Sequence, residues 1–248
     1  MPLMPVKYDK EWGLVAILDA LGAASYTEDE ITRFLGSRKL ALALLDEKAD
    51  AVLGTIRKDH LTTFTFNDTV VIIYRTERQS TLADVKSFFT LLRKFVVDSL
   101  ANRILFRGSI AIGLFYVDDD SNTILGPAVT DAASWYDRAD WIGVHATPHA
   151  SMYIESLVDG NAKISNILCV DYSVPLTDGT AVAVKAVNWP KAFYVPSLTP
   201  CIGAEHPRAK CLQLLAKHGM PRGTERKYQN SMAFFDHVAK VQKLKAKQ

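Results

Sequence analysis

Alternating stretches of apolar and polar residues divide the chain into strands and helices. Residues 13–20 (GLVAILDA) form an apolar run that ends in an acid and precedes Gly22, a pattern typical of a buried strand followed by a tight turn. Thr27 and Glu30 have capping-box spacing, which predicts that a long helical stretch begins here and continues to about Lys58. We expect the glycines at positions 36 and 54, Gly36 and Gly54, to break this stretch into two helices.

A hairpin, a helix and a strand follow in the next part of the chain. Residues 62–75 (TTFTFNDTVVIIYR) hold two β-rich runs separated by Asn67-Asp68, which predicts a hairpin with Asp68 at its tip. Residues 82–102 repeat apolar residues at helical spacing, and residues 105–117 form the next expected strand. The remaining expected elements are a helix over 128–140, a strand over 141–148, a hairpin over 167–188 and a mostly helical segment from about Pro207.

The order of these elements, β-α-β-β-α-β, defines the split βαβ arrangement of ferredoxin-like and palm folds. The predicted fold class is therefore α+β, an antiparallel sheet with helices packed on one face. We expect this domain to span residues 1–195, with residues 196–248 forming a C-terminal helical extension packed on its core. Such a fold supports many functions and does not by itself identify one.

The composition is that of an ordinary soluble globular protein, with 48% hydrophobic and 23% charged residues among 248. The net charge is +2, and four lysines lie in the last nine residues: Lys240, Lys243, Lys245 and Lys247. The rest of the chain is slightly acidic, which argues against a nucleic-acid partner. Residues 1–12 contain no long apolar run and no window approaches a membrane span, so we expect a cytoplasmic protein without a membrane partner.

Cysteine and histidine give no convincing metal site. The chain has three cysteines, Cys169, Cys201 and Cys211. Their odd number suits a reducing compartment, and a zinc site that combines two of them with His206 fits no common spacing, so buried or idle thiols are expected. His145 and His149 are separated by Pro148, which argues against a helical metal pair and predicts solvated loop histidines.

Two aspartates are the strongest chemical signal in the chain. Asp19 ends the first strand and Asp68 occupies the hairpin tip; each alone is ordinary turn chemistry, but in a split βαβ sheet they should converge. Two close carboxylates repel one another unless a cation lies between them, and oxygen ligands suit Mg²⁺ or Mn²⁺. Small residues follow Asp19 and can offer backbone N–H groups to a phosphate chain: Ala20, Gly22, Ala23, Ala24 and Ser25. The joint pattern predicts a metal–triphosphate site.

Four segments resemble motifs of the class III nucleotidyl cyclases. Residues 19–24 (DALGAA) resemble the D-I-x-G-F-T segment, and residues 66–68 (FND) resemble the I-G-D hairpin. Residues 107–113 (RGSIAIG) resemble the R-x-G-I-x-x-G strand, and residues 126–135 (GPAVTDAASW) resemble the G-x-x-V-N-x-A-x-R-L segment. Their order and spacing hold over about residues 12–190, and the set is moderately specific although no single motif is.

This resemblance implies a site and an assembly. Asp19 and Asp68 would bind two metal ions, Mn²⁺ or Mg²⁺, assisted by the backbone carbonyl of Ala20. Gly22, Ala23 and Ala24 would bind the phosphates of a nucleoside triphosphate. The catalytic sites would lie at the interface of a head-to-tail homodimer.

The chain departs from the family at the positions that read the base. Purine cyclases of the family carry a lysine four residues before the second aspartate, where this chain has Phe64. The partner acid aligns with Thr123, which is both donor and acceptor and discriminates weakly. Phe64 could stack on a base but cannot make the polar contact of a lysine. An adenylyl cyclase of the usual kind is therefore disfavoured.

A second departure concerns the transition state. The asparagine and arginine of the family align with Thr130 and Ser134, so the cation that would stabilise charge on the transferring phosphoryl group is missing. Arg138, one helical turn further on, could lean back and substitute, or it could be a surface charge paired with Asp137 or Asp140. Arg107 is interpreted as a strand-end structural residue that could also face phosphate.

A compact cyclase-like domain with a non-purine base pocket resembles the pyrimidine cyclases of Pycsar anti-phage defence. This resemblance implies UTP or CTP as the substrate and cyclic UMP or cyclic CMP as the product. The alternative is a catalytically silent cyclase-like module that binds a nucleotide or a partner protein. A diguanylate-type palm domain is a weaker alternative, because residues 66–69 (FNDT) lack the Gly-Gly-acid-acid hairpin tip.

Overall fold

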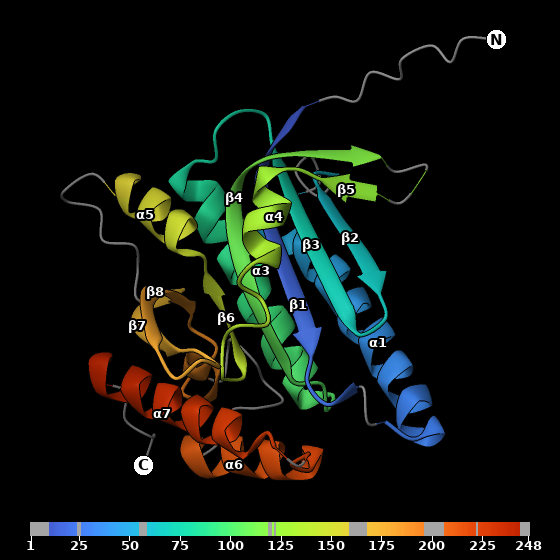
Figure 1. Cartoon of the computed structure of the whole chain (residues 1–248), viewed down its shortest axis with the longest axis vertical. Helices are drawn as coiled ribbons and strands as arrows, with labels where there is room; N and C mark the ends of the chain where they lie inside the picture. Colours follow the sequence, from blue (N-terminus) through green and yellow to red (C-terminus); the bar gives the residue numbers. More distant parts are fainter. Residues whose placement is uncertain are drawn as a thin grey trace.

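One mixed β-sheet organises the chain, with helices on both of its faces rather than on one face as predicted (Figure 1). The computed structural model describes residues 10–23, 26–54, 59–118, 121, 123–158, 168–195, 206–221 and 223–243. Its strands are β1 (Glu11–Ala20), β2 (Leu61–Phe66), β3 (Thr69–Thr76), β4 (Phe106–Asp118), β5 (Thr123–Leu125), β6 (Gly143–Ala146), β7 (Cys169–Pro175) and β8 (Ala181–Val187). Its helices are α1 (Glu28–Leu53), α3 (Leu82–Ala101), α4 (Pro127–Ala133), α5 (Pro148–Ser156), the 3₁₀ helix η2 (Pro190–Phe193), α6 (Pro207–His218) and α7 (Glu225–Val241).

The strand order confirms the predicted α+β class. The sheet runs β2-β3-β1-β4-β6-β8-β7, and β5 pairs with the outer part of β4. The first four strands are antiparallel neighbours in the split βαβ order. The pair β4–β6 is parallel, so the sheet is mixed rather than wholly antiparallel. This pairing is possible because the chain between the two strands returns through β5 and α4 and re-enters the sheet in the same direction.

The face of the sheet beneath α1 and α3 holds the main core. Leu14, Ala16 and Leu18 of β1 point to this face and are fully buried together with aromatic residues of α3. The helix α1 is continuous through Gly36, so the predicted break there is wrong. A β-carbon added at Gly36 would have no heavy atom within 4 Å beyond the backbone of its own helix, so this glycine occupies a solvent-facing position of the helix. Gly54, with φ 76°, does end the helix as predicted, whereas residues 55–58 lie outside the described part.

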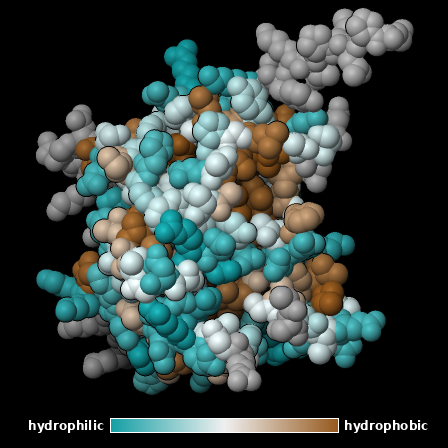
Figure 2. Space-filling model, in the orientation of Figure 1, coloured by the Kyte–Doolittle hydropathy of each residue, from teal (hydrophilic) through white to brown (hydrophobic). Residues whose placement is uncertain are grey.

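The opposite face is only partly covered. Val15 and Ile17 of β1 point to it, and α4 packs over them, held by a hydrogen bond of 2.6 Å from the Ser109 hydroxyl to the Ala132 carbonyl. The helix α4 ends at Ala133 and the chain continues in turns to Arg138, so the helix predicted over 128–140 is too long. Outside α4 the same face carries apolar side chains that are half-buried or exposed, which we call the open face: Phe64, Phe66, Val71, Val117 and Ile124. Figure 2 shows hydrophobic side chains gathered in this region, over β3, β4 and β5.

The described parts of the C-terminal segment pack on the core. Phe234 and Phe235 of α7 are fully buried, and the Phe234 ring lies 4.8 Å from the ring of Trp141. Cys211 of α6 is buried in the same core. Burial raises the pKa of Cys211 and of Cys169 to about 12, so both are inert thiols as expected, while Cys201 lies outside the described residues.

His145 differs from its prediction. It lies in β6, fully buried, with its ring 6.5 Å from that of Trp135 and 6.3 Å from that of Trp141. Only His149 is exposed, at the start of α5. The prediction failed because β6 crosses the sheet interior, where packing between two tryptophans buries an imidazole. Within the described ranges, no helix has both the length and the apolar character that crossing a bilayer requires.

Candidate active site

The end of β1 and the tip of the β2–β3 hairpin bring Asp19 and Asp68 together. Asp19 pairs in register with Thr69, the first residue of β3, and Asp68 directly precedes Thr69. The Ala20 N–H donates to the Asp68 carbonyl at 3.2 Å, which ties the strand end to the turn. Asn67 has φ 52°, a left-handed conformation that asparagine tolerates well and that a two-residue hairpin turn requires.

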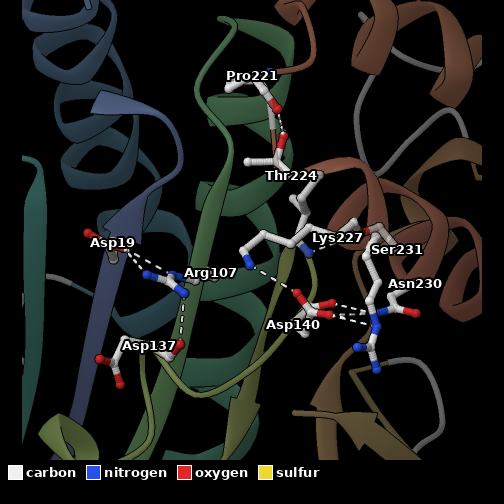
Figure 3. A network of polar contacts seen from close by, with 11 residues as sticks. Asp19, Arg107, Asp137, Asp140, Pro221, Thr224, Lys227, Asn230 and Ser231 are labelled. Carbon is white, nitrogen blue, oxygen red and sulfur yellow. Dashed lines mark hydrogen bonds and ion pairs between the residues drawn. The ribbon is translucent and has the colours of Figure 1, made fainter. Parts of the chain in front are cut away.

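Arg107 lies on the other side of Asp19. The two residues are cross-strand partners in the β1–β4 ladder, so their side chains share one face of the sheet. The Nε and a terminal nitrogen of Arg107 both contact Oδ2 of Asp19 at 3.0 Å. The remaining terminal nitrogen donates to the Asp137 carbonyl at 2.7 Å, in the turn after α4 (Figure 3). Arg107 therefore links β1, β4 and this turn.

The local electrostatics disfavour a bare negative charge on Asp19. Burial raises the pKa of Asp19, and the neighbouring charges of Asp68 and Asp137 raise it further, against the lowering effect of Arg107. Burial also raises the pKa of Tyr136, with contributions from the charges of Asp137, Asp19 and Asp68. The phenol of Tyr136 is therefore within electrostatic reach of the carboxylate pair.

The donor set fits a hard divalent cation. Asp19 and Asp68 offer carboxylate oxygens, and Mg²⁺ in proteins is usually held by one or two carboxylates together with water and substrate phosphates. Among the described residues, no group of three or more His, Cys, Asp or Glu side chains is placed to hold a metal. The other ligands would therefore have to come from backbone carbonyls, water and a phosphorylated substrate. Both contacts of Arg107 go to Oδ2 of Asp19, so a metal ion would bind this carboxylate through Oδ1.

The loop after β1 is shaped by contacts from distant segments. Gly22 has φ +85°, and a β-carbon on it would lie 3.0 Å from the ring of Pro221, in the α6–α7 loop. The Tyr26 N–H donates to the Ala23 carbonyl at 3.2 Å. Ala24, the third predicted phosphate-binding residue, lies outside the described residues. The first turn of α1 is capped by Thr27 and carries three acids, Glu28, Asp29 and Glu30. These acids repel an anion at the helix start, so the predicted phosphate site is limited to the loop before the helix.

A cavity of about 500 Å³ opens beside Asp68. It is lined by Ala23, Tyr26, Ile31, Phe34, Leu35, Asn67 and Asp68. None of the described residues that line it is cationic, so an anionic ligand held by these residues would need a cation on the carboxylates. Arg38 lies at its border, where its guanidinium donates to the Asn67 carbonyl and lies over the Phe34 ring.

The predicted base-reading residues lie away from this edge. Phe64 is a half-buried residue of the open face, opposite Val71 in the β2–β3 ladder. Thr123 pairs with Asp118 at the outer end of β4, and its hydroxyl exchanges hydrogen bonds with Ser121. Phe64 lies on β2, the outermost strand on its side of the sheet, whereas Thr123 lies on β5, which pairs with the outer part of β4.

The predicted transition-state residues lie in α4 and in the turns that follow it. Thr130 and Ser134 are exposed, and the Ser134 hydroxyl donates to the Asp131 carbonyl at 2.8 Å. Arg138 does not lean back toward Ser134, because its guanidinium lies 4.6 Å from the Trp135 ring centre and 3.8 Å from Asp178. Its ion-pair partner is therefore Asp178, in the β7–β8 turn, rather than Asp137 or Asp140.

Sequence reasoning missed the partner of Asp19. The antiparallel register of β1 and β4 places Arg107 opposite Asp19, and this register could have been derived from the predicted strands. The positions of Tyr136 and of the Asp137 carbonyl depend on where α4 ends, and no sequence signal marks that end clearly.

Comparisons with known proteins give structural likeness without sequence likeness. No family model matches the chain, and no curated protein matches its sequence. The adenylyl cyclase CyaB from P. aeruginosa is similar in structure with a TM-score of 0.49 and 13% identity, covering 73% of this chain and 96% of that one. The catalytic core of a rhodopsin-guanylyl cyclase with converted specificity, in complex with ATPalphaS, has a TM-score of 0.47 and 10% identity, covering 73% of this chain and 98% of that one. The guanylyl cyclase Cya2 has a TM-score of 0.44 and 11% identity, covering 73% of this chain and 94% of that one.

Proposed function

We propose that this chain is a metal-dependent nucleotidyl cyclase that converts a nucleoside triphosphate to the 3′,5′-cyclic nucleotide and pyrophosphate. The observation that carries the proposal is the carboxylate pair: the β1–β3 register and the Ala20–Asp68 hydrogen bond hold Asp19 beside Asp68 at one sheet edge. The four cyclase-like motifs in family order add support from the sequence.

The residues would divide the work as follows. Asp19 and Asp68 would hold Mg²⁺ or Mn²⁺, assisted by the Ala20 carbonyl. The ions, when bound, would reduce the charge on the triphosphate and favour attack of the ribose 3′ oxygen on the α-phosphorus. Gly22 and Ala23 would offer backbone N–H groups to phosphate. Arg107, beside Asp19, would supply the fixed positive charge that Ser134 does not.

We further propose that the base is a pyrimidine, UTP or CTP, and that the product acts as a signal in anti-phage defence. Phe64 offers an aromatic surface without a polar group, so it would stack on a base rather than read a purine edge. Thr123 would complete the base pocket from its short strand. Thr130 and Ser134 would contact the transferring group through their exposed hydroxyls, and Arg138 would act there only after leaving Asp178.

The proposed assembly is a homodimer through the open face. Phe66 is 75% exposed, and Phe64, Val71 and Ile124 are only half-buried. A contiguous apolar face of this kind is typical of a protein–protein interface. Pairing two chains through it would let the Asp19 site of one chain meet the Phe64 side of the other.

The test is product analysis with each substrate separately. The purified protein is incubated with ATP, GTP, CTP or UTP and Mn²⁺, and products are identified by mass spectrometry. We expect cyclic UMP or cyclic CMP, and no product from Asp68→Asn. Asp236→Asn is the matched control, because it removes an exposed aspartate charge that pairs with Arg208 between α6 and α7. Full turnover by Asp68→Asn would overturn the assignment.

The second candidate is a silent cyclase-like module that binds a nucleotide or a partner protein. It is favoured by the Ser134 hydroxyl, which is used in a bond to its own helix, and by Arg107, which occupies Asp19. Metal-dependent nucleotide binding without product from any of the four triphosphates would select this candidate.

A further inference from the structure

The start of α7 touches the carboxylate site from two directions. Pro221, just before the helix, lies against Gly22 in the loop that follows Asp19. In the first turn of the helix, Lys227 contacts Asp140, in the segment that follows α4. Thr224 joins these two points, because its hydroxyl donates to the Pro221 carbonyl at 2.6 Å and its residue is the N-cap of α7.

The contact with Asp140 is extensive and mostly buried. The Lys227 Nζ lies 2.9 Å from Oδ1 of Asp140, and the side-chain exposures are 14% and 8%. The Asn230 side-chain amide donates to the Asp140 main-chain carbonyl at 2.6 Å. The Ile142 N–H donates to the Ser231 hydroxyl at 2.7 Å. The helix α7 therefore fixes both the side chain of Asp140 and the backbone around it.

This anchored segment continues directly to Arg107. The Asp137 carbonyl, three residues before Asp140, accepts the hydrogen bond from Arg107 at 2.7 Å. The same guanidinium holds Oδ2 of Asp19. Figure 3 shows the whole path, from Lys227 through Asp140 and the turn at Asp137 to Arg107 and Asp19.

We propose that the start of α7 is the positioning element of the carboxylate site, with Lys227 and Pro221 as its positioning residues. Lys227 fixes the turn that aims Arg107 at Asp19, and Pro221 fixes the loop that leaves Asp19. The inference rests on the proposed function in treating Asp19 as a metal ligand. It extends that function by making the C-terminal helical pair part of the site rather than an appendage.

The expected effect is partial, because the β7–β8 hairpin also holds the segment. The Thr177 N–H donates to the Arg138 carbonyl and the Asp140 N–H donates to the Pro175 carbonyl, both at 2.8 Å. Loss of a group that orients a metal ligand directly typically lowers metal affinity by about 10–100-fold. Lys227 acts through Asp140, Asp137 and Arg107, so we expect Lys227→Met to weaken Mn²⁺ binding by about threefold to tenfold.

The experiment reads the geometry and the metal separately. The Arg107 Nε–H signal is identified in ¹⁵N NMR spectra of the full chain by its loss in Arg107→Lys. Mn²⁺ binding is measured by electron paramagnetic resonance without nucleotide. Lys227→Met should shift or broaden the Arg107 signal and weaken Mn²⁺ binding. Arg208→Met is the matched control, since it removes a cation that pairs with Asp236 between α6 and α7, outside the path to Asp19, and should change neither readout.

Three results have distinct meanings. An unchanged Arg107 signal in folded Lys227→Met would overturn the positioning role, whatever the protein catalyses. Failure of the wild-type chain to bind Mn²⁺, together with a shifted Arg107 signal in Lys227→Met, would overturn the proposed function and leave the positioning role supported. If Lys227→Met does not fold, Pro221→Ala tests the second contact. It removes only the ring beside Gly22, and an unchanged Mn²⁺ affinity and Arg107 signal in it would overturn the proposal.

Discussion

Two mostly buried aspartates at either end of one polar network, Asp19 and Asp140, are satisfied in different ways (Figure 3). Both oxygens of Asp140 meet cations, since Lys227 lies 2.9 Å from Oδ1 and Arg226 lies 3.0 Å from Oδ2. Among the described residues Asp19 has one cationic partner, Arg107, and both contacts go to the same oxygen, Oδ2. Burial raises the pKa of Asp19 despite that partner.

This difference separates a structural role from a functional one. A buried carboxylate with two cations is fully compensated and stabilises the fold when its partners stay in place. A buried carboxylate with one cation and a second carboxylate nearby is under-compensated, and perturbed groups of this kind concentrate at functional sites. Asp140 therefore anchors α7, whereas Asp19 retains the capacity to take a further cation.

The largest expected effect is on turnover in Asp19→Asn. Metal-held charge stabilisation contributes several kcal/mol to a transition state, so product formation should fall by at least about 10³-fold. The free energy of unfolding should fall by no more than about 1–2 kcal/mol, because Arg107 loses its countercharge but keeps its hydrogen bond to the Asp137 carbonyl, and the neutral amide relieves a charge that burial disfavours. Mass spectrometry of products and urea unfolding measure the two quantities. A stable variant that keeps wild-type turnover would remove the functional half of the comparison.

Asp140→Asn should act mainly on stability. Removing one partner from a mostly buried ion pair leaves Lys227 without its countercharge, and we expect a loss of about 3 kcal/mol in the free energy of unfolding. Urea unfolding at neutral pH gives the value, with Asp178→Asn as the exposed control. A loss below about 1 kcal/mol would show that Asp140 is no more structural than a surface acid.

A third titratable group, His145 of β6, is fully buried. Burial lowers its pKa from 6.5 to about 4, so the unfolded chain takes up the proton first as the pH falls. The stability that depends on neutral His145 is complete above pH 6.5 and is lost as the pH falls toward 4. Between about pH 8 and about pH 5 this amounts to about 2 kcal/mol.

His145→Gln isolates that contribution because glutamine does not titrate. Urea unfolding of both proteins at several pH values should give curves that diverge below pH 6.5, the wild type losing more stability. Parallel curves would show that the imidazole becomes protonated without leaving its place between Trp135 and Trp141.

The smallest expected effect distinguishes the two cations on Asp140. Arg226 has a side-chain exposure of 57%, and exposed ion pairs contribute about 0–1 kcal/mol. Arg226→Ala should therefore lower the free energy of unfolding by under about 1 kcal/mol, while Lys227→Ala, on the buried side, should lower it by more. Equal losses in the two variants would mean that the exposed arginine anchors Asp140 as strongly as the buried lysine.

Much of the fold could be predicted from the sequence because its signals are local. The apolar run over 13–20, the Asn67-Asp68 turn and the helical spacing over 82–102 each determine one element. Together they imply the split βαβ order, and that order alone places Asp19 beside Asp68. The position of the candidate metal site could therefore be predicted from the sequence.

The rest depends on contacts between segments far apart in the chain. Asp140 and Lys227 are 87 residues apart, and no pattern along the sequence signals that contact. The end of α4 at Ala133 and the burial of His145 depend on how α4 and the tryptophans pack on the sheet. Local propensity says little about such positions, because tertiary packing overrides it.

The open face has a consequence for how the amount of protein controls output. If active sites form only where two chains meet across this face, dilute protein is mostly unpaired, and the number of pairs follows the square of the free chain concentration. Halving the protein in that regime would lower total product formation about fourfold rather than twofold. The concentration of the chain would then control the output, and the specific activity measured over a dilution series would fall with each dilution.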